Sequence, residues 1–295
     1  MGNGNAMSCG TSGSTSGGDR RLAFAGLLVA VATMATGCTA DDPLNPSFAL
    51  TLADSKLALR EMAREPRPYN RPVVVLGGIY DPGVVASVLG DKFRRLSGEP
   101  DQVISVSFFG QGSFDRCRER VIRRVDEAFP TDDPDRTVEV DVVGVSMGGL
   151  VARYAAAPRA DGGRTLRIRR LFTISTPHRG AQMATLPTID RRTLDMRPGS
   201  AFLDGLDNAL AAQDYLIIPY TRLDDAVVGE ANTAPTGRAP FWVPNVPGSF
   251  AHMFAMEDPR ILADIARRLR GETPFTIEPP MPLPGRTAPT ATAAH

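Results

Sequence analysis

The 295-residue chain is poor in lysine, cysteine and histidine and has no excess of charge of either sign. Arginine and lysine together number 33, as do aspartate and glutamate, and this balance argues against a nucleic-acid-binding protein. Three cysteines form no disulfide framework. Lysine occurs only at Lys56 and Lys92, which we attribute to the base composition of the source genome. With 42 % apolar residues, the chain is long enough for one large globular domain with tails.

Residues 1–38 have the features of an export signal. Residues 1–18 are rich in Gly, Ser and Asn, and Arg20-Arg21 precede an apolar run that ends at Gly37. The run is too short for a comfortable membrane span but fits a signal-peptide core. Its end, Ala35-Thr36-Gly37-Cys38, resembles a bacterial lipoprotein signal, although Ala35 stands where leucine is usual and the n-region is long. The resemblance implies export and a lipid anchor at Cys38, on the periplasmic or outer side of a membrane. An ordinary cleaved signal, with Cys38 incidental, is the alternative.

After Cys38, alternating apolar and amphipathic segments predict an α/β fold with a mostly parallel, doubly wound sheet flanked by helices. The predicted strands are 72–76, 103–108, 138–145, 168–175 and 215–220. The predicted helices are 54–64, 82–96, 113–129, 150–157 and 258–270, with one or two short helices within 190–212. We divide the chain into a tether and leading helix (39–66), one α/β domain (67–271) and a disordered or extended Pro/Thr/Ala-rich tail (272–295). In such a sheet, the ligand site lies at the carboxyl ends of the strands.

One segment combines a strand, a sharp turn and a helix around a serine. An apolar run ends at Val145, and its last two residues begin the motif Gly144-Val145-Ser146-Met147-Gly148. A helix-forming run follows the motif. The Gly-x-Ser-x-Gly pattern alone is weak, because chance supplies it in roughly one chain in ten of this length. Its context is that of a nucleophile elbow, in which the Ser146 hydroxyl stands above the sheet edge and the helix N-terminus faces a developing oxyanion. The alternative is a spectator serine in a glycine-rich turn.

A serine nucleophile needs a histidine as its base, and the chain has three. His295 is the last residue of the predicted tail and is set aside. His252 lies in a predicted loop before the last helix, and His178 directly follows the strand after Ser146. The chain order Ser, acid, His of α/β hydrolases favours His252, because little chain separates Ser146 from His178.

The acid and the oxyanion donors are expected after other strands. Asp224 and Asp225 both follow the strand at 215–220, and the residues alone leave both open. The backbone N–H of Ile79, after Gly77-Gly78, and that of Met147 are the candidate oxyanion donors. A polar turn and a simple strand-ending Gly-Gly are the alternatives.

These segments resemble the α/β-hydrolase superfamily and, within it, the bacterial lipase and esterase group. The resemblance covers about residues 71–270 and is carried by Val142–Gly149, Ile174–Ala181, Met196–Leu203 and Asp225–Val228. It departs at Gly77-Gly78, where these enzymes more often carry His-Gly.

The resemblance implies a triad of Ser146, Asp225 and His252, in which Asp225 rather than Asp224 is the acid and His178 is not the base. It implies an ester or lipid substrate, and it requires no metal and no organic cofactor. An acyltransferase or thioesterase with the same triad, and a non-catalytic ligand-binding lipoprotein, are the alternative functions; a peptidase is less favoured. The oligomeric state is open.

Two further features have two interpretations each, and Cys117 has one. Residues 194–210 form a small lid or acyl-binding wall, or an ordinary amphipathic helix packed on the sheet. Trp242 lines the pocket or fills the core. Cys117 is expected to be a small buried or half-buried apolar residue.

Overall fold

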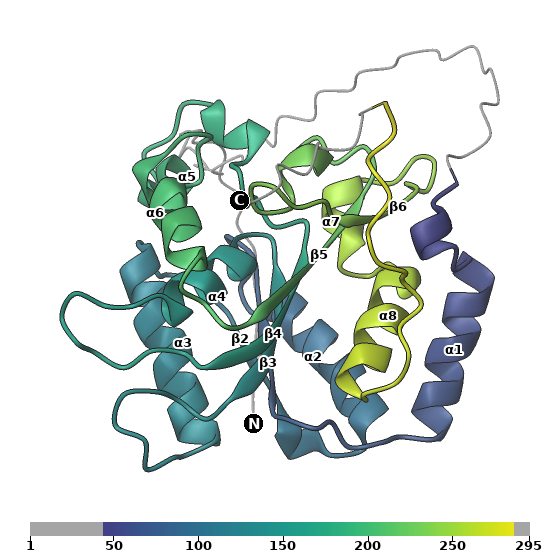
Figure 1. Ribbon diagram of the computed structural model, residues 1–295, viewed down its shortest axis with the longest axis horizontal. Coiled ribbons are helices and arrows are strands. Elements are labelled where there is room, and N and C mark those ends of the chain that lie inside the picture. The colour runs from purple at the N-terminus through teal and green to yellow at the C-terminus, as the bar shows by residue number, and fades with distance from the viewer. Residues whose placement is uncertain (1–43, 286–295) are drawn as a thin grey trace, which may run out of the picture. The chain divides into compact units, whose positions relative to one another are not determined.

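The computed structural model describes residues 44–285 and contains a six-stranded sheet in which every neighbouring pair of strands is parallel (Figure 1). The order across the sheet is β2-β1-β3-β4-β5-β6. The strands are β1 (Val73–Leu76), β2 (Val103–Val106), β3 (Val140–Val145), β4 (Ile168–Ile174), β5 (Leu216–Arg222) and β6 (Phe241–Val243). The predicted parallel, doubly wound sheet is therefore confirmed, and all carboxyl ends of the strands lie at one edge.

Eight α-helices are described between residues 44 and 285. They are α1 (Leu52–Arg64), α2 (Val84–Ser97), α3 (Phe114–Ala128), α4 (Met147–Ala156), α5 (Arg191–Asp195), α6 (Ala201–Leu210), α7 (Ala251–Ala255) and α8 (Pro259–Leu269). Four 3₁₀ helices accompany them: η1 (Pro46–Phe48), η2 (Pro100–Gln102), η3 (Gln182–Thr185) and η4 (Glu230–Asn232).

Capping side chains and one glycine set the helix ends. The Thr51 and Ser113 hydroxyls accept hydrogen bonds from backbone N–H groups three residues ahead, so α1 and α3 begin directly after them. Helix α2 was predicted to begin at Pro82, with the proline in its first turn. It begins instead at Val84, because Gly83 has a left-handed backbone (φ 107°) that cannot continue a right-handed helix.

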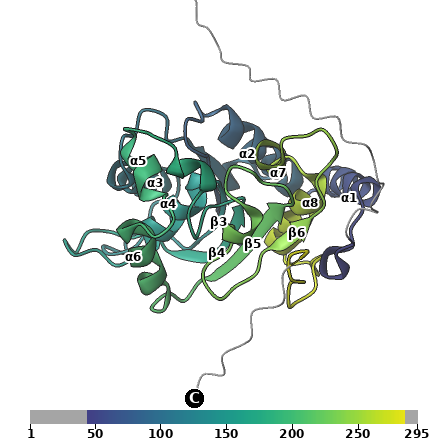
Figure 2. The ribbon, with the colours of Figure 1, turned by 90° about the horizontal axis from the view of Figure 1, so that it is seen from above.

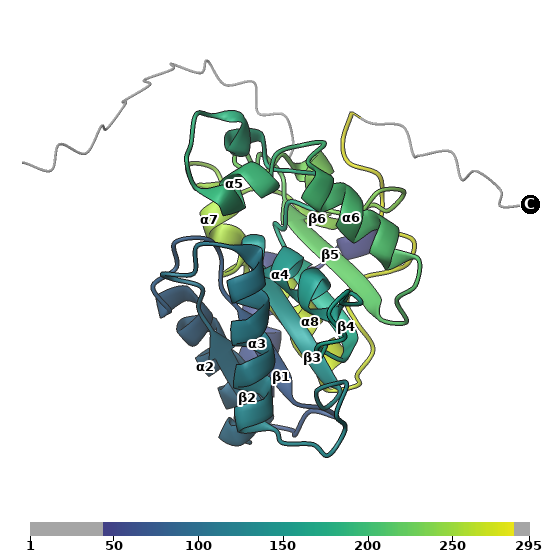
Figure 3. The same cartoon turned by 90° about the vertical axis from the view of Figure 1, so that its left-hand side faces the viewer.

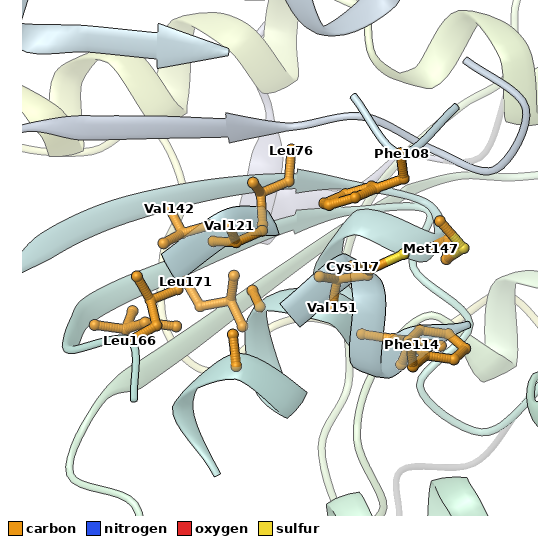
Figure 4. Close-up of a cluster of buried hydrophobic side chains, with 14 of the residues drawn as sticks. Leu76, Phe108, Phe114, Cys117, Val121, Val142, Met147, Val151, Leu166 and Leu171 are labelled. Atoms are coloured by element: carbon orange, nitrogen blue, oxygen red, sulfur yellow. The ribbon is translucent and has the colours of Figure 1, made fainter. Parts of the chain in front are cut away.

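Helices cover both faces of the sheet. Helices α3 and α4 pack on one face, and α1, α2 and α8 pack on the other (Figures 1 and 3). The view from above shows the sheet between these two layers (Figure 2). Figure 4 shows a cluster of buried hydrophobic side chains, in which Cys117 of α3 lies among Val121, Met147 and Val151. Cys117 is fully buried, as predicted, and burial raises the pKa of its thiol to about 11.

Two short elements next to the site were not predicted. Strand β6 adds to the sheet beside β5, with Tyr220 opposite Phe241. Helix α7 occupies the segment that was expected to be a loop before the last helix. Its five residues contain no long apolar repeat, so their periodicity gives no helix signal.

The tether and the tail contact the domain more than predicted. In the tether region, the buried Phe48 packs on Tyr220 and Phe241. Residues 272–285 form no helix or strand, yet Trp242 Nε1 donates to the carbonyl oxygen of Met281 at 3.0 Å. The tail was predicted to be disordered or extended, and backbone groups of this part of it find partners on the domain.

The predicted signal peptide, Cys38 and the last ten residues lie outside the described residues. None of the helices between residues 44 and 285 has the length and hydropathy of a transmembrane span.

Candidate active site

Ser146 lies between β3 and α4 in a strained backbone conformation. Its φ of 51° and ψ of −123° are unusual for a residue with a side chain. Hydrogen bonds hold this turn from both sides: the Ser146 N–H donates to the Ile174 carbonyl at 2.9 Å, and the Thr176 hydroxyl donates to the Ser146 carbonyl at 2.8 Å. The strand, turn and helix predicted around Ser146 are therefore present.

The glycines at either side of Ser146 are required by close packing. A Cβ on Gly144 would lie 2.6 Å from the Gly149 Cα, and a Cβ on Gly148 would lie 2.5 Å from the Leu76 carbonyl oxygen. Both distances are far below a van der Waals contact. The Gly-x-Ser-x-Gly pattern thus lets the first turn of α4 lie directly against β1 and β3.

The structure brings Ser146, His252 and Asp225 into one hydrogen-bonded series. Ser146 Oγ lies 3.2 Å from His252 Nε2, and His252 Nδ1 lies 2.9 Å from Asp225 Oδ2. The serine follows β3, the aspartate follows β5, and the histidine lies on α7 rather than in the predicted loop. Because a carboxylate only accepts, His252 Nδ1 carries the hydrogen and Nε2 is free to accept the serine proton.

The two neighbouring aspartates have different environments. Asp225 is buried, whereas Asp224 is exposed and has a left-handed backbone (φ 64°). Asp225 Oδ1 accepts from the N–H groups of Val227 and Val228 at 3.1 and 3.0 Å. Burial raises the pKa of Asp225, but the hydrogen bonds from His252 and Val228 outweigh burial and hold the pKa below its ordinary value. Of the two aspartates, Asp225 is the one whose carboxylate is held by backbone hydrogen bonds and is hydrogen-bonded to His252.

The predicted oxyanion donors flank Ser146. Met147 is the first residue of α4, so its N–H has no acceptor within the helix. Ile79 lies in the turn after β1 and lines the same cavity as Ser146. A Cβ on the neighbouring Gly78 would lie 3.4 Å from Ser146 Cβ, so this turn passes directly beside the serine.

Asp81 explains why no side chain fits at Gly77, where the sequence departs from lipases. A Cβ on Gly77 would lie 2.4 Å from Asp81 Oδ2. The buried Asp81 carboxylate accepts hydrogen bonds from the N–H groups of Gly83, Val85 and Ala86 at 2.9 to 3.0 Å. Asp81 therefore fixes the turn between β1 and α2. Sequence reasoning missed this role, and an Asp three residues before the first residue of a helix was the available signal.

Ser146 and His252 border a mostly apolar cavity of about 550 Å³. Its wall includes four methionines, whose flexible side chains adapt to irregular apolar ligands. The apolar wall residues include Ile79, Val85, Ala181, Met183, Ala184, Met196, Val227, Val228, Met253 and Met256. No group of three or more His, Cys, Asp or Glu side chains in residues 44–285 is placed to hold a metal ion.

His178 lies in a separate, buried network. Its Nδ1 lies 3.1 Å from Arg153 Nη1, and its Nε2 lies 3.1 Å from Thr173 Oγ1. Because the guanidinium only donates, His178 Nδ1 accepts and Nε2 donates to Thr173. Burial first, and then the charge of Arg153, hold the pKa of His178 well below its ordinary value. The Arg153 guanidinium also donates to Asp207 Oδ1 at 2.7 Å.

The two interpretations of the lid region and of Trp242 are resolved by burial. Leu203 and Leu206 of α6 are buried, and the ring of Phe202 stacks on that of Phe114 with 4.1 Å between the ring centres. Helix α6 is therefore an amphipathic helix packed on the domain. Within 194–210, Met196 lines the cavity, so the wall interpretation holds for the part of this range that precedes α6; Met183, Ala184 and Thr193 lie before the range and line the cavity too. Trp242 is buried against Leu223 and Leu283 and fills a small core.

One protein-family model matches a central part of the chain. Residues 116–195 match the model of the PGAP1-like alpha/beta domain. That range includes the Ser146 turn and His178 but neither Asp225 nor His252. No curated protein matches the chain.

Several solved structures are similar to the chain. The lin2722 gene product from Listeria innocua has 13 % identity over 69 % of this chain and 95 % of that one, with a TM-score of 0.48. The lipase BlEst2 from Bacillus licheniformis has 14 % identity over 72 % of this chain and 94 % of that one, with a TM-score of 0.44. The phospholipase PlaB from Legionella pneumophila has 14 % identity over 56 % of this chain and 43 % of that one, with a TM-score of 0.42. The chain therefore spans less than half of the length of that phospholipase. The parallel sheet, its strand order and the strand–turn–helix around Ser146 are those of an α/β-hydrolase fold.

Proposed function

We propose that the protein is a serine hydrolase that cleaves carboxylic esters with an apolar acyl group through an acyl-enzyme. The observation that carries the proposal is the hydrogen-bonded series from Ser146 through His252 to Asp225, at the border of an apolar cavity. A nucleophile, a base within reach and an acid that orients the base are the parts that acyl transfer needs.

In the proposed first half-reaction, Ser146 Oγ attacks the ester carbonyl carbon and its proton passes to His252 Nε2. The tetrahedral oxyanion accepts hydrogen bonds from the Ile79 and Met147 N–H groups. In a well-studied hydrolase, one such donor contributes about 3–4 kcal/mol to transition-state stabilisation. The carbonyl then re-forms, the C–O bond to the alcohol breaks, and His252 Nε2 gives its proton to the leaving oxygen.

In the proposed second half-reaction, water attacks the acyl-enzyme and loses a proton to His252. The second tetrahedral intermediate collapses, and the proton returns to Ser146 Oγ as the carboxylic acid leaves. Throughout, Asp225 holds the His252 Nδ1–H and stabilises the positive charge that forms on the ring. Its two backbone hydrogen bonds keep the carboxylate ionised and fixed.

We further propose that the protein is exported and anchored to a membrane by a lipid on Cys38, on the strength of the signal-like sequence before that residue. Metabolic labelling with a fatty acid, compared between the wild type and Cys38→Ser, tests this separately from catalysis. A labelled wild type and an unlabelled variant are expected. A labelled variant, or an unlabelled wild type, contradicts the anchor.

An acyl-chain-length series of p-nitrophenyl esters, measured on purified wild type and on Ser146→Ala, tests the activity. We expect turnover that rises with chain length while the chain fills the apolar cavity, and turnover at background in the variant. Ser87→Ala, an exposed serine of α2 outside the cavity wall, is the matched control and keeps full activity. Full activity in Ser146→Ala contradicts the proposal.

The same assay separates the alternatives. Added alcohols that capture most of the acyl group identify an acyltransferase, and a marked preference for matched thioesters identifies a thioesterase. A folded protein that binds apolar ligands without turning over any ester is a binding lipoprotein.

A further inference from the structure

Tyr80, the residue after the proposed oxyanion donor Ile79, has a strained backbone. Its φ of 61° lies in the left-handed region, which a residue with a bulky side chain rarely adopts. Such a conformation persists only where the surrounding structure holds it. Burial does not hold Tyr80, because 58 % of the residue is exposed. The hydrogen bond of its hydroxyl is a restraint on this conformation from outside the turn, beside the Asp81 hydrogen bonds that fix the turn from within.

A single carboxylate holds the Tyr80 hydroxyl. The hydroxyl donates to Asp190 Oδ2 at 2.9 Å, and the Arg192 guanidinium lies 5.5 Å from the centre of the Tyr80 ring. Arg192 also donates to both Asp190 oxygens, at 3.1 and 2.7 Å. The hydrogen bonds from Arg192 and Tyr80 outweigh burial and lower the pKa of Asp190 to about 2, so the carboxylate stays ionised.

Asp190 and Arg192 belong to a segment that covers the cavity, residues 182–196, which we call the cap segment. Four residues of the cap segment line the cavity. Near its start, the Met183 N–H donates to the Val227 carbonyl at 3.0 Å, in the loop that follows Asp225. Near its end, the buried Arg192 donates to the Phe108 carbonyl at 3.4 Å, beyond β2. The cap segment is therefore tied to the loop of the acid through Met183 and to the segment after β2 through Arg192, and the Tyr80–Asp190 hydrogen bond joins it to the turn of the oxyanion donor.

We infer that Tyr80 is a positioning residue: its hydrogen bond to Asp190 fixes the orientation of the Ile79 N–H, and so makes the oxyanion site depend on the position of the cap segment. The inference rests on the proposed function. A peptide unit that is free to rotate points its N–H at the oxyanion only part of the time. The Ile79 N–H belongs to the peptide between Gly78 and Ile79, so Tyr80 acts on it through the Ile79 Cα: holding Tyr80 in place limits how far that Cα, and with it the N–H, can move. The effect is felt where charge develops, in the transition state.

Tyr80→Phe removes the hydroxyl and keeps the ring in the cavity wall. We expect kcat to fall about tenfold with KM nearly unchanged, less than the roughly 10²–10³-fold loss of a whole oxyanion donor. Tyr154→Phe is the matched control, because Tyr154 also donates its hydroxyl to an aspartate, Asp115 Oδ1 at 2.6 Å, on the surface. An unchanged kcat in Tyr80→Phe, or an equal fall in Tyr154→Phe, overturns the inference.

A double-mutant cycle tests whether the two residues act together. Asp190→Asn alone is expected to lower kcat by a similar factor, and adding it to Tyr80→Phe is expected to lower kcat little further. Independent, multiplicative effects overturn the link, and the thermal midpoint of each variant shows whether it is folded. Ser146→Ala measured alongside separates the two proposals: activity in that variant refutes the proposed function, whereas its loss together with full kcat in Tyr80→Phe refutes only the inference.

Discussion

Two histidines of this chain are hydrogen-bonded through both ring nitrogens, yet their surroundings are opposite. His252 lies between a serine hydroxyl and the carboxylate of Asp225, and 13 % of its side chain is exposed at the cavity. His178 is fully buried between a threonine hydroxyl and the guanidinium of Arg153. The guanidinium partner of His178 opposes a protonated ring.

The comparison shows that the partner at Nδ1 decides what each histidine can do. At His252, Nδ1 donates to an anion, so Nε2 is a free acceptor that faces a hydroxyl. At His178, Nδ1 accepts from a cation, so Nε2 is a donor and a proton taken up by the ring would be unfavourable. His252 has the arrangement of a general base, and His178 that of a neutral structural bridge in the core.

The largest expected effect comes from replacing each histidine in turn. His252→Ala is expected to lower kcat by about 10⁴-fold or more, because the base is lost, while stability changes little. His178→Ala is expected to keep kcat per folded molecule but to lower the free energy of unfolding by about 2–4 kcal/mol, because buried donors of Arg153 lose their acceptor. Ester turnover and urea unfolding of both variants measure this. The reverse pattern would mean that His178 is the base.

The next effect concerns the acid. Asp225→Asn is expected to lower kcat by about 10³–10⁴-fold, because an amide no longer fixes the His252 tautomer or balances its charge. The neighbouring variant Asp224→Asn provides the control, since Asp224 is exposed, and is expected to stay within about twofold of the wild type. Steady-state kinetics of the pair would contradict the account if Asp224→Asn were the more damaging change.

The smallest expected effect is the pH dependence of stability that His178 causes. In the unfolded chain, a histidine binds a proton below about pH 6.5, whereas the native ring of His178 stays neutral to much lower pH. The unfolded state therefore binds more protons in that window, so stability is full above about pH 6.5 and decreases as the pH falls below it. Between about pH 7.5 and 5.5, His178 should contribute a loss of about 1 kcal/mol.

His178→Gln removes the titrating ring and keeps a group that can accept from Arg153. Urea unfolding at both pH values should show a smaller loss of stability in this variant than in the wild type. An equal loss would mean that the native His178 is protonated like an ordinary histidine.

The sheet was predictable from the sequence because its strands are short apolar runs between turn signals. Five strands were predicted to within a few residues. The missed strand β6 has only three residues, Phe241–Val243, and pairs with the end of β5, so it depends on a tertiary contact. Helix α7 was missed because its five residues are too few to show an apolar repeat.

The sequence pointed to the residues of the candidate site, but not to the side chains that hold its strained turns in place. Chain order pointed to His252 over His178, but the two aspartates could be ranked only by the resemblance to lipases. In the described chain, the non-glycine residues with positive φ are Tyr80, Ser146, Ser175 and Asp224. They follow β1, β3, β4 and β5, at the edge of the sheet where the site lies. No sequence pattern shows that Thr176 and Asp190 hold these turns, because their partners, the Ser146 carbonyl and the Tyr80 hydroxyl, are distant in the sequence. The partners of Asp81 are nearby N–H groups, so its role had a local signal that was missed.

The most direct test of the central claim is mass-spectrometric mapping of a fluorophosphonate adduct on the purified protein. We expect one adduct, on Ser146, formed rapidly in the wild type and in His178→Gln and formed slowly or not at all in His252→Ala. An adduct on another serine, or labelling that is equally fast without His252, would contradict the claim that Ser146 is a nucleophile activated by His252.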